Sequence, residues 1–119
     1  MKKKSKKARL KRKNEFRFHK VEVTTKKGRI RKISHPAYVF LEKGNIYIYV
    51  STTHSKGVEG YMLIKMKKNP NPHDTRDTYI VLDVREDIKS AFGSKEEDWE
   101  IDKDDESVVR SLYVSKKKR

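Results

Sequence analysis

Residues 35–53, HPAYVFLEKGNIYIYVSTT, contain two β-strand patterns joined by a short turn signal. The turn is KGN at 43–45, and glycine next to asparagine is typical of tight β-hairpins. In the second strand, three aliphatic residues alternate with Tyr47 and Tyr49, so one face is aliphatic and the other is aromatic. This stretch therefore predicts an antiparallel hairpin whose first strand is buried.

Two further strand patterns precede this hairpin. In residues 16–23, FRFHKVEV, two phenylalanines share one face, but Val21 and Val23 follow after a slip of one position. Such a slip indicates a β-bulge within the strand. After the turn signal TTKKG, residues 29–33, RIRKI, predict a short and heavily charged strand of the kind found at sheet edges.

The C-terminal half predicts two more strands and a helix. Residues 61–67 and 78–84 have strand patterns, and the proline-containing segment between them predicts an irregular loop. A helix is expected to begin after Asp102 or Asp104, since aspartate is a favoured N-cap. Its apolar stripe consists of Val108, Val109, Leu112 and Tyr113. We therefore expect a mainly β (α+β) fold, a small twisted antiparallel sheet or partly open barrel of about six strands with one C-terminal helix.

The length of 119 residues fits one globular domain, expected at 15–115. Residues 1–13 contain nine lysines and arginines and no acid, so we expect residues 1–14 to form a disordered basic arm. Residues 116–119 form a basic tail. Of the net charge of +14, most lies in these two segments, because residues 14–115 carry 18 basic and 17 acidic residues.

Composition excludes several classes of protein. No apolar run approaches the roughly 18 residues that a membrane span requires, and no apolar run follows the basic N-terminus as in a secretory signal. The absence of cysteine excludes disulfides, thiolate metal ligands and a cysteine nucleophile. We therefore expect a cytoplasmic protein with no membrane partner.

The charge distribution predicts a polyanionic partner. Residues 16–68 carry 12 basic and 3 acidic residues, whereas residues 69–115 carry 6 and 13, so the cations are concentrated in the first half of the fold. Cations interleaved with aromatic side chains are typical of nucleic-acid interfaces, and we expect RNA more than DNA. The candidate contacts are Lys11, Arg12, Lys13, Arg29, Arg31, Lys32, Tyr47, Tyr49, Lys65, Lys67 and Lys68.

A candidate catalytic cluster lies where the central hairpin ends. Metal-independent RNA cleavage needs a base, an acid and cations for the developing phosphorane charge. Because strands 36–42 and 45–53 are antiparallel, His35 and His54 should approach each other at one end of the sheet. Arg76, in the proline-containing loop, could contact the phosphate. The candidate catalytic residues are His35, Thr53, His54, Ser55, Lys56 and Arg76.

Simpler interpretations exist for the same residues. His54 can be one surface histidine in a polar loop, and the tyrosines can belong to the core. His19, within the first strand, is expected to be structural or to contact RNA rather than to catalyse. His73 and Asp74 resemble metal ligands, but no third ligand is evident, so neither a metal nor a cofactor is expected.

The run from HPAYVFLEKGNIYIYVSTTHSKG to YMLIKMKKNPNPHDTRDTYI, followed by FG and a tryptophan, resembles small proteins of bacterial mobile elements and phages. Such proteins are similar to toxin-type ribonucleases: PemK/MazF-like barrels, type III toxin–antitoxin ribonucleases and the barnase/RelE-like group. The resemblance covers residues 35–113. It implies roles for Thr53, Ser55 and Lys56, as in the type III toxins, and for His35, as in the barnase/RelE-like group.

Three functions stay open at this point. The resemblance implies a metal-independent endoribonuclease of toxin or phage-effector type, with a protein or RNA antitoxin or an inhibitor target as partner. The charge also fits a non-catalytic RNA- or DNA-binding module, such as a ribosome-associated factor or a phage inhibitor of a nucleic-acid-handling machine. The acidic segment 96–106 could instead dock a basic partner protein.

Overall fold

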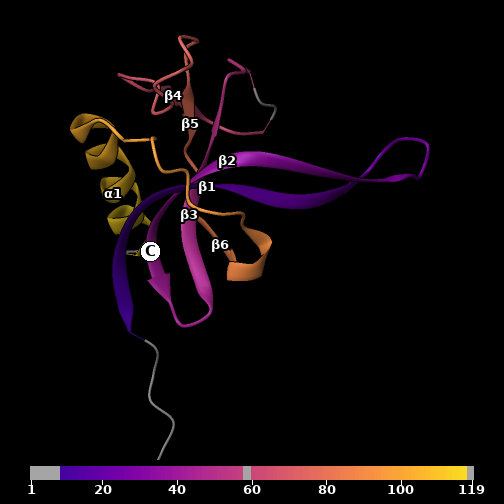
Figure 1. Cartoon of the computed structure of the whole chain (residues 1–119), viewed down its shortest axis with the longest axis horizontal. Coiled ribbons are helices and arrows are strands. Elements are labelled where there is room, and N and C mark those ends of the chain that lie inside the picture. The colour runs from indigo at the N-terminus through magenta and orange to yellow at the C-terminus, as the bar shows by residue number, and fades with distance from the viewer. Residues whose placement is uncertain (1–8, 58–59, 118–119) are drawn as a thin grey trace, which may run out of the picture.

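The computed structural model describes residues 9–57 and 60–117, which form six strands, one short 3-10 helix and one α-helix (Figure 1). The elements are β1 (Leu10–Thr24), β2 (Ile30–Lys43), β3 (Ile46–Thr53), β4 (Leu63–Lys65), β5 (Tyr79–Val81), β6 (Arg85–Ile88), η1 (Lys89–Ala91) and α1 (Lys103–Lys117). Strand order is β1-β2-β3-β5-β4, with β6 also paired to β3, and every pair is antiparallel. The predicted mainly β fold with one C-terminal helix is confirmed, and the sheet is open.

The central hairpin of β2 and β3 has the two-faced pattern that its sequence predicts. Gly44 has a φ of 58°, a left-handed conformation that glycine adopts readily in a tight turn. Ile48 and Val50 are buried on the face that α1 covers, whereas Tyr47 and Tyr49 belong to a second cluster on the opposite face. The hairpin therefore contributes to two cores, one on each side of the sheet.

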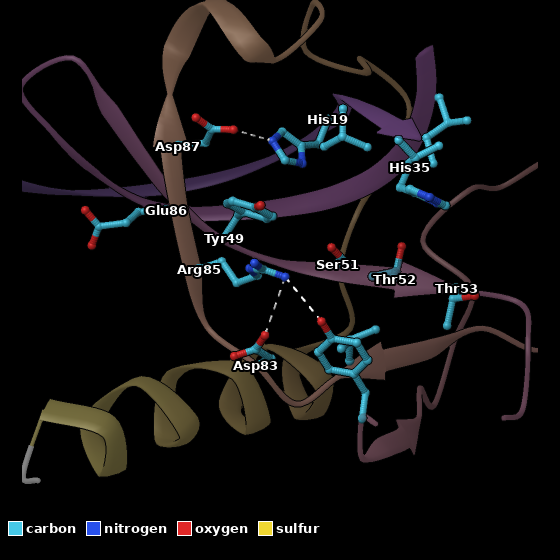
Figure 2. Close-up of a pocket in the computed structure, with 15 residues that line it drawn as sticks. His19, His35, Tyr49, Ser51, Thr52, Thr53, Asp83, Arg85, Glu86 and Asp87 are labelled. Atoms are coloured by element: carbon cyan, nitrogen blue, oxygen red, sulfur yellow. Dashed lines mark hydrogen bonds and ion pairs between the residues drawn. The ribbon is translucent and has the colours of Figure 1, made fainter. Parts of the chain in front are cut away.

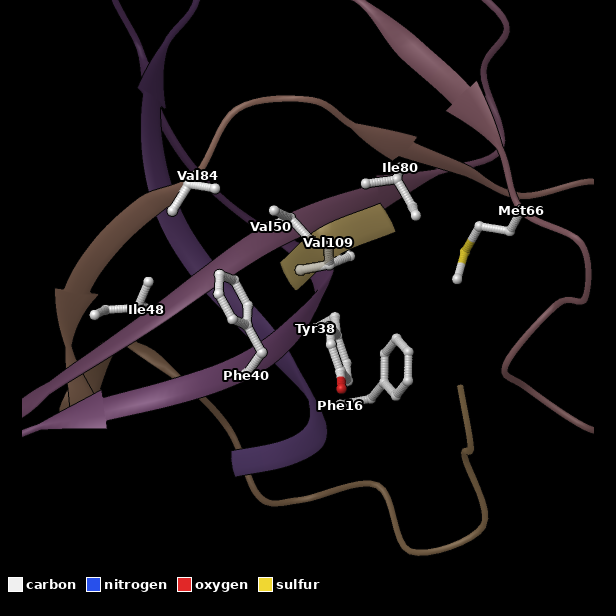
Figure 3. Packing of buried hydrophobic residues seen from close by; sticks show 9 residues of the cluster. All are labelled: Phe16, Tyr38, Phe40, Ile48, Val50, Met66, Ile80, Val84 and Val109. Atoms are coloured by element: carbon white, nitrogen blue, oxygen red, sulfur yellow. The ribbon is translucent and has the colours of Figure 1, made fainter. Parts of the chain in front are cut away.

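The larger core lies between the sheet and α1 (Figure 3). Its buried members are Phe16, Tyr38, Phe40, Ile48, Val50, Met66, Ile80, Val84 and Val109. The other three residues of the predicted helical stripe, Val108, Leu112 and Tyr113, pack against this cluster and are partly buried. Asp102 is the N-cap, because its carboxylate accepts the backbone N–H of Asp104 at 2.8 Å.

Polar contacts also fix α1 against the sheet. Buried Asp105 accepts the backbone N–H groups of Lys67 at 2.8 Å and Lys68 at 3.3 Å. Arg110 donates to the carbonyl oxygens of Phe40 at 3.2 Å and Lys13 at 2.9 Å. These contacts hold α1 on one face, and of the described helices only the short η1, with the residues beside it, lies on the other face.

The predicted edge strand 29–33 is not separate, because it continues through Pro36 as part of β2. The carbonyl of Phe18, which pairs with Pro36, accepts the N–H of Gly93 at 2.9 Å and therefore points away from β2. Pairing of β2 with β3 ends at Ala37. Proline is tolerated because neither neighbouring strand requires an N–H at this position.

The bulge predicted between Phe18 and Val21 is wrong. Pairing of β1 with β2 is unbroken from Glu15 to Thr24, and the irregularity lies between Arg12 and Glu15. Regular alternation places Val21 on the face opposite Phe18. Both faces carry apolar residues because one meets the core and the other lines a cleft.

Several boundaries differ from those predicted. Residues 10–14 lie in β1 rather than in a disordered arm, and Lys116 and Lys117 lie in α1. Residues 1–8 of the predicted arm and 118–119 of the predicted tail lie outside the described residues. β6 had no sequence signal of its own, since REDI is short and charged. Among the helices of the described residues, none has the length and apolar character needed to cross a membrane.

Candidate nucleic-acid interface

The sheet face opposite α1 is only partly covered. Phe92, which follows η1, packs on this face against Tyr47 and Tyr49, with ring centroids 5.2 Å apart in both pairs. Beyond this small cluster the face opens into a cleft of about 600 Å³ (Figure 2). β1, β2, β3 and β6 all contribute side chains to it.

A histidine–carboxylate pair forms one end of the cleft. Nε2 of His19 lies 2.8 Å from Oδ2 of Asp87, and Figure 2 shows the second ring nitrogen facing away from Asp87. The hydrogen bond from His19 lowers the pKa of Asp87, while burial acts in the opposite direction. Since a carboxylate only accepts, Nε2 carries the proton, and Nδ1 of neutral His19 is a free acceptor.

The ring of His19 is held in place by aromatic neighbours. It is stacked on Phe92 with centroids 4.6 Å apart and lies 4.7 Å from the ring of Tyr49. His35 is its direct partner in the β1–β2 register, lines the same cleft and is exposed. The adjacent strands therefore present two histidines to one space.

Arg85 lies across the cleft and is also paired. Its Nη1 donates to the hydroxyl of Tyr61 at 3.4 Å and lies 3.8 Å from Oδ2 of Asp83. With Arg85 opposed by Asp83 and His19 by Asp87, the cleft carries no excess of positive charge. It is therefore poorly suited to hold a phosphate group within it.

The excess of cations lies on the segment of the β1–β2 hairpin that projects from the domain, residues 20–34, which we call the ribbon (Figure 1). None of its residues is buried, and Ile30 is 68% exposed. Its six cations are Lys20, Lys26, Lys27, Arg29, Arg31 and Lys32, and its one acid is Glu22. Across residues 9–57 and 60–117, every ion pair involves cations outside the ribbon.

A second, smaller cleft of about 230 Å³ brings together four of the six predicted catalytic residues. His35, Thr53, His54 and Ser55 all line it. The expected approach of the two histidines at one end of the hairpin thus corresponds to a shared cleft. Its remaining walls include Asp74 and Trp99.

The two predicted cations of this site are placed differently. Lys56 is exposed and does not line the cleft. Both Nε and Nη2 of Arg76 donate to the carboxylate of Asp74, at 3.0 and 2.7 Å. This pairing lowers the pKa of Asp74, and Arg76 is not free to bind a phosphate while it lasts.

His54 is held through both ring nitrogens. Nδ1 lies 3.0 Å from the carbonyl oxygen of Asp77, which only accepts, so Nδ1 carries a proton. Nε2 lies 3.4 Å from Oδ2 of Asp74. Nε2 of neutral His54 can therefore accept a proton, and the carboxylate would stabilise the resulting cation.

Several predicted nucleic-acid contacts are engaged within the protein. Nζ of Lys67 lies 2.7 Å from Asp104 and Nζ of Lys65 lies 3.5 Å from Asp77. Lys68 is exposed and lies in neither pairing. The acidic segment that could dock a partner protein thus supplies at least one internal partner.

Of the three predicted nucleic-acid contacts near the N-terminus, two are also in ion pairs within the protein. Nη2 of Arg12 lies 3.0 Å from Glu106, and Nζ of Lys13 lies 3.0 Å from Glu15. Lys11 is exposed. These residues belong to the edge of the sheet rather than to a mobile basic arm.

The predicted stacking tyrosines do not present open ring faces. Tyr47 is 8% and Tyr49 is 4% exposed, and Phe92 packs against both. The cleft instead has Tyr61, which is 44% exposed. Sequence alone could not show that Tyr61, rather than Tyr47 or Tyr49, is accessible, because alternation along β3 does not show what covers its aromatic face.

Sequence patterns also missed the pairing of His19 with Asp87. The two residues are 68 positions apart, and Asp87 lies on β6, which has no apolar alternation. Strict alternation from Phe16 would have placed His19 on the face of Val21 and Val23, which was the available signal.

No protein-family model, curated protein or solved structure matches the chain. Within the residues that the structure describes, no three histidine, cysteine, aspartate or glutamate side chains gather in a way that could hold a metal ion.

Proposed function

We propose that this protein binds nucleic acid and that the ribbon is its main contact with the phosphate backbone. The observation that carries the proposal is the concentration of six cations and one acid on an unburied projection. Half of the cations elsewhere in the described fold are opposed by carboxylates, as in Lys67 with Asp104 and Arg76 with Asp74, and the others are dispersed over β1, the end of β2, α1 and the loops. The ribbon cations are in no such ion pair among the described residues.

The physical basis is the release of counterions from phosphates. Each phosphate that a lysine or arginine neutralises frees condensed cations, so log affinity falls with log salt by about 0.7 per contact for a single strand. Cations already paired with carboxylates contribute less, because a phosphate must first displace the partner. Because its six cations lie together, we expect the ribbon to be the largest single contributor to the salt dependence of the described domain.

A salt titration tests this proposal. Fluorescence anisotropy with a labelled oligonucleotide, from about 50 to about 200 mM salt, should give a slope that becomes about 2 less steep when three ribbon cations are neutralised. The ribbon variant is Lys26→Gln, Lys27→Gln and Arg29→Gln, and the matched control is Lys43→Gln, Lys95→Gln and Lys103→Gln. Both variants lose three charges, but only the first removes them from the ribbon.

Equal slopes for the two variants would show that net charge, rather than the ribbon, determines binding. Residues 1–8 also carry cations, so the same pair of variants should be measured in a chain without residues 2–8. The difference between ribbon and control variants should persist in that shorter chain.

A second candidate function is metal-independent endoribonuclease activity of toxin or phage-effector type. The observation that favours it is the shared cleft of His35, Thr53, His54 and Ser55. Nε2 of His54 could accept the proton of a 2′-hydroxyl, and His35 could protonate the leaving oxygen. Arg76 would have to exchange Asp74 for the phosphate to stabilise the developing charge.

Incubating end-labelled RNA with the purified protein in EDTA tests this activity. We expect fragments with the wild-type protein and intact RNA with His54→Ala. His73→Ala is a suitable control, since His73 is exposed and lines neither histidine cleft. Intact RNA after hours with folded wild-type protein would exclude the enzyme and leave the binding proposal standing.

A further inference from the structure

The large cleft and the ribbon form one continuous surface. Directly paired residues of antiparallel strands share a face, and β1 and β2 pair His19 with His35 and Val21 with Ile33. All four residues line the cleft. The next pair on that face is Val23 with Arg31, so the first ribbon cation beyond the cleft is on the same face.

The chemistry of the cleft favours an uncharged, flat and hydrogen-bonding group. Its walls include the aliphatic side chains of Val21, Val23 and Ile33. Its charged residues are Arg85 and the three acids Asp83, Glu86 and Asp87, a lining that disfavours an anion, and its floor provides the hydroxyl of Ser51 and a ring nitrogen of His19. A nucleobase has such a body and such an edge, whereas a phosphate does not.

Cleft and ribbon together therefore suit a nucleotide unit, with the base in the cleft and the phosphate on the ribbon. We infer that the cleft holds an unpaired base of a single-stranded nucleic acid, with Tyr61 against the base and Arg31 on the adjoining phosphate. This inference rests on the proposed function and makes it more specific. A base inside a duplex cannot enter the cleft, because its edge and both faces are already engaged.

Two matched pairs of variants test the inference. Tyr61 and Met62 are adjacent and exposed, at 44% and 75%, but only Tyr61 lines the cleft. Arg31 and Lys32 carry the same charge, but they are adjacent in β2, so their side chains lie on opposite faces of the ribbon. In the strand register, Arg31 is opposite Val23 and Lys32 is opposite Glu22. Each pair thus compares a residue at the proposed binding site with a similar residue away from it.

The probe is a single-stranded oligonucleotide with one 2-aminopurine, whose fluorescence reports base stacking. It is made both as RNA and as DNA, so that the preference for one of them can be measured. We expect Tyr61→Ala to weaken binding about 10-fold and to reduce the change in fluorescence. Tyr61→Phe and Met62→Ala should behave like the wild-type protein, because both keep the aromatic ring. Arg31→Ala should weaken binding about 10-fold, and Lys32→Ala should weaken it clearly less.

The results separate this inference from the proposed function. If a duplex of the same length binds as tightly as the single strand, or if Tyr61→Ala matches Met62→Ala, the base site is wrong while ribbon binding stands. If the folded wild-type protein binds neither strand nor duplex at about 50 mM salt, the proposed function fails as well. Thermal melts of all five variants establish that each one is folded.

Discussion

Asp105 shows how one side chain connects the sequence to the shape of the interface. It is buried at the start of α1 and accepts the backbone N–H groups of Lys67 and Lys68. Those two amides would otherwise lack partners at the junction of the helix with the loop that follows β4. The contact thus keeps α1 on one face and leaves the opposite face available.

We therefore predict that Asp105→Ala destabilises the fold by about 2 kcal/mol, since it removes a buried carboxylate that accepts two backbone N–H groups. Asp105→Asn, which retains one acceptor oxygen, should cost less. Urea denaturation followed by tryptophan fluorescence measures both, because Trp99 packs against the core under α1. Equal stability of Asp105→Ala and the wild-type protein would show that water replaces the carboxylate.

Carboxylates with lowered pKa values predict a stability that depends on pH. The pKa of Asp87 is lowered by the hydrogen bond from His19, and that of Asp104 by the hydrogen bond from Lys67. A group with a lowered pKa in the native state stabilises it above the unfolded value, 3.8 for aspartate, and this stabilisation is lost as the pH falls toward the native value.

The urea midpoint should therefore decrease as the pH falls from about 5 to about 2. Asp87→Asn should flatten part of this dependence, because asparagine does not titrate and can still accept from His19. Asp98→Asn is a suitable control, since Asp98 is exposed and in no ion pair of the described residues. A midpoint that stays constant, or a slope that Asp98→Asn flattens equally, would contradict this assignment.

At the scale of single residues, sequence predicted what the local pattern determines. The alternation of Ile48 and Val50 with Tyr47 and Tyr49 was confirmed, as was Asp102 as one of two possible N-caps. Side-chain partners were not predictable, because pairs such as His19 with Asp87 join distant parts of the chain.

At the scale of elements, the ribbon is the part of the sheet with the least packing. Residues 22–32 are exposed except Thr25, which is partly buried, whereas residues 37–40 and 47–50 are all buried. Backbone hydrogen bonds without buried apolar contacts open at low free energy. The distal ribbon is therefore stabilised mainly by the hydrogen bonds between its two strands.

We predict that amides of the distal ribbon, such as Val23 and Arg31, exchange with deuterium much faster than those of Val39 and Val50. Adding a saturating single-stranded oligonucleotide should slow exchange in the ribbon and leave the core unchanged. Hydrogen exchange followed by NMR measures both effects. Protection that increases in α1 and not in the ribbon would show that the nucleic acid binds the helical face, which would contradict the proposal.

The length of the ribbon was not evident from sequence because Pro36 interrupts the strand pattern. A proline inside a strand usually indicates an edge or an end. Here the Phe18 carbonyl turns toward Gly93, so the position tolerates proline and β2 runs through it. β6 was missed for a related reason, since β3 recruits it by tertiary pairing.

At the scale of the whole molecule, the two faces of the sheet differ in what they carry. One face carries the larger core beneath α1, and the other carries the cleft that leads onto the ribbon. Acidic residues of the helical side pair with nearby cations, as Asp104 does with Lys67 and Glu106 with Arg12. The ribbon, in contrast, carries six cations that are in no ion pair of the described residues and lie close together on one projection.

Mapping the bound strand on the protein by NMR tests this division most directly. Titrating a labelled sample with a short single-stranded oligonucleotide should shift backbone amides in residues 19–35, at Ser51 and at Tyr61. Amides of α1, residues 103–117, should stay in place. Shifts concentrated on α1, or spread evenly over both faces, would contradict the proposal that the ribbon and its cleft bind nucleic acid.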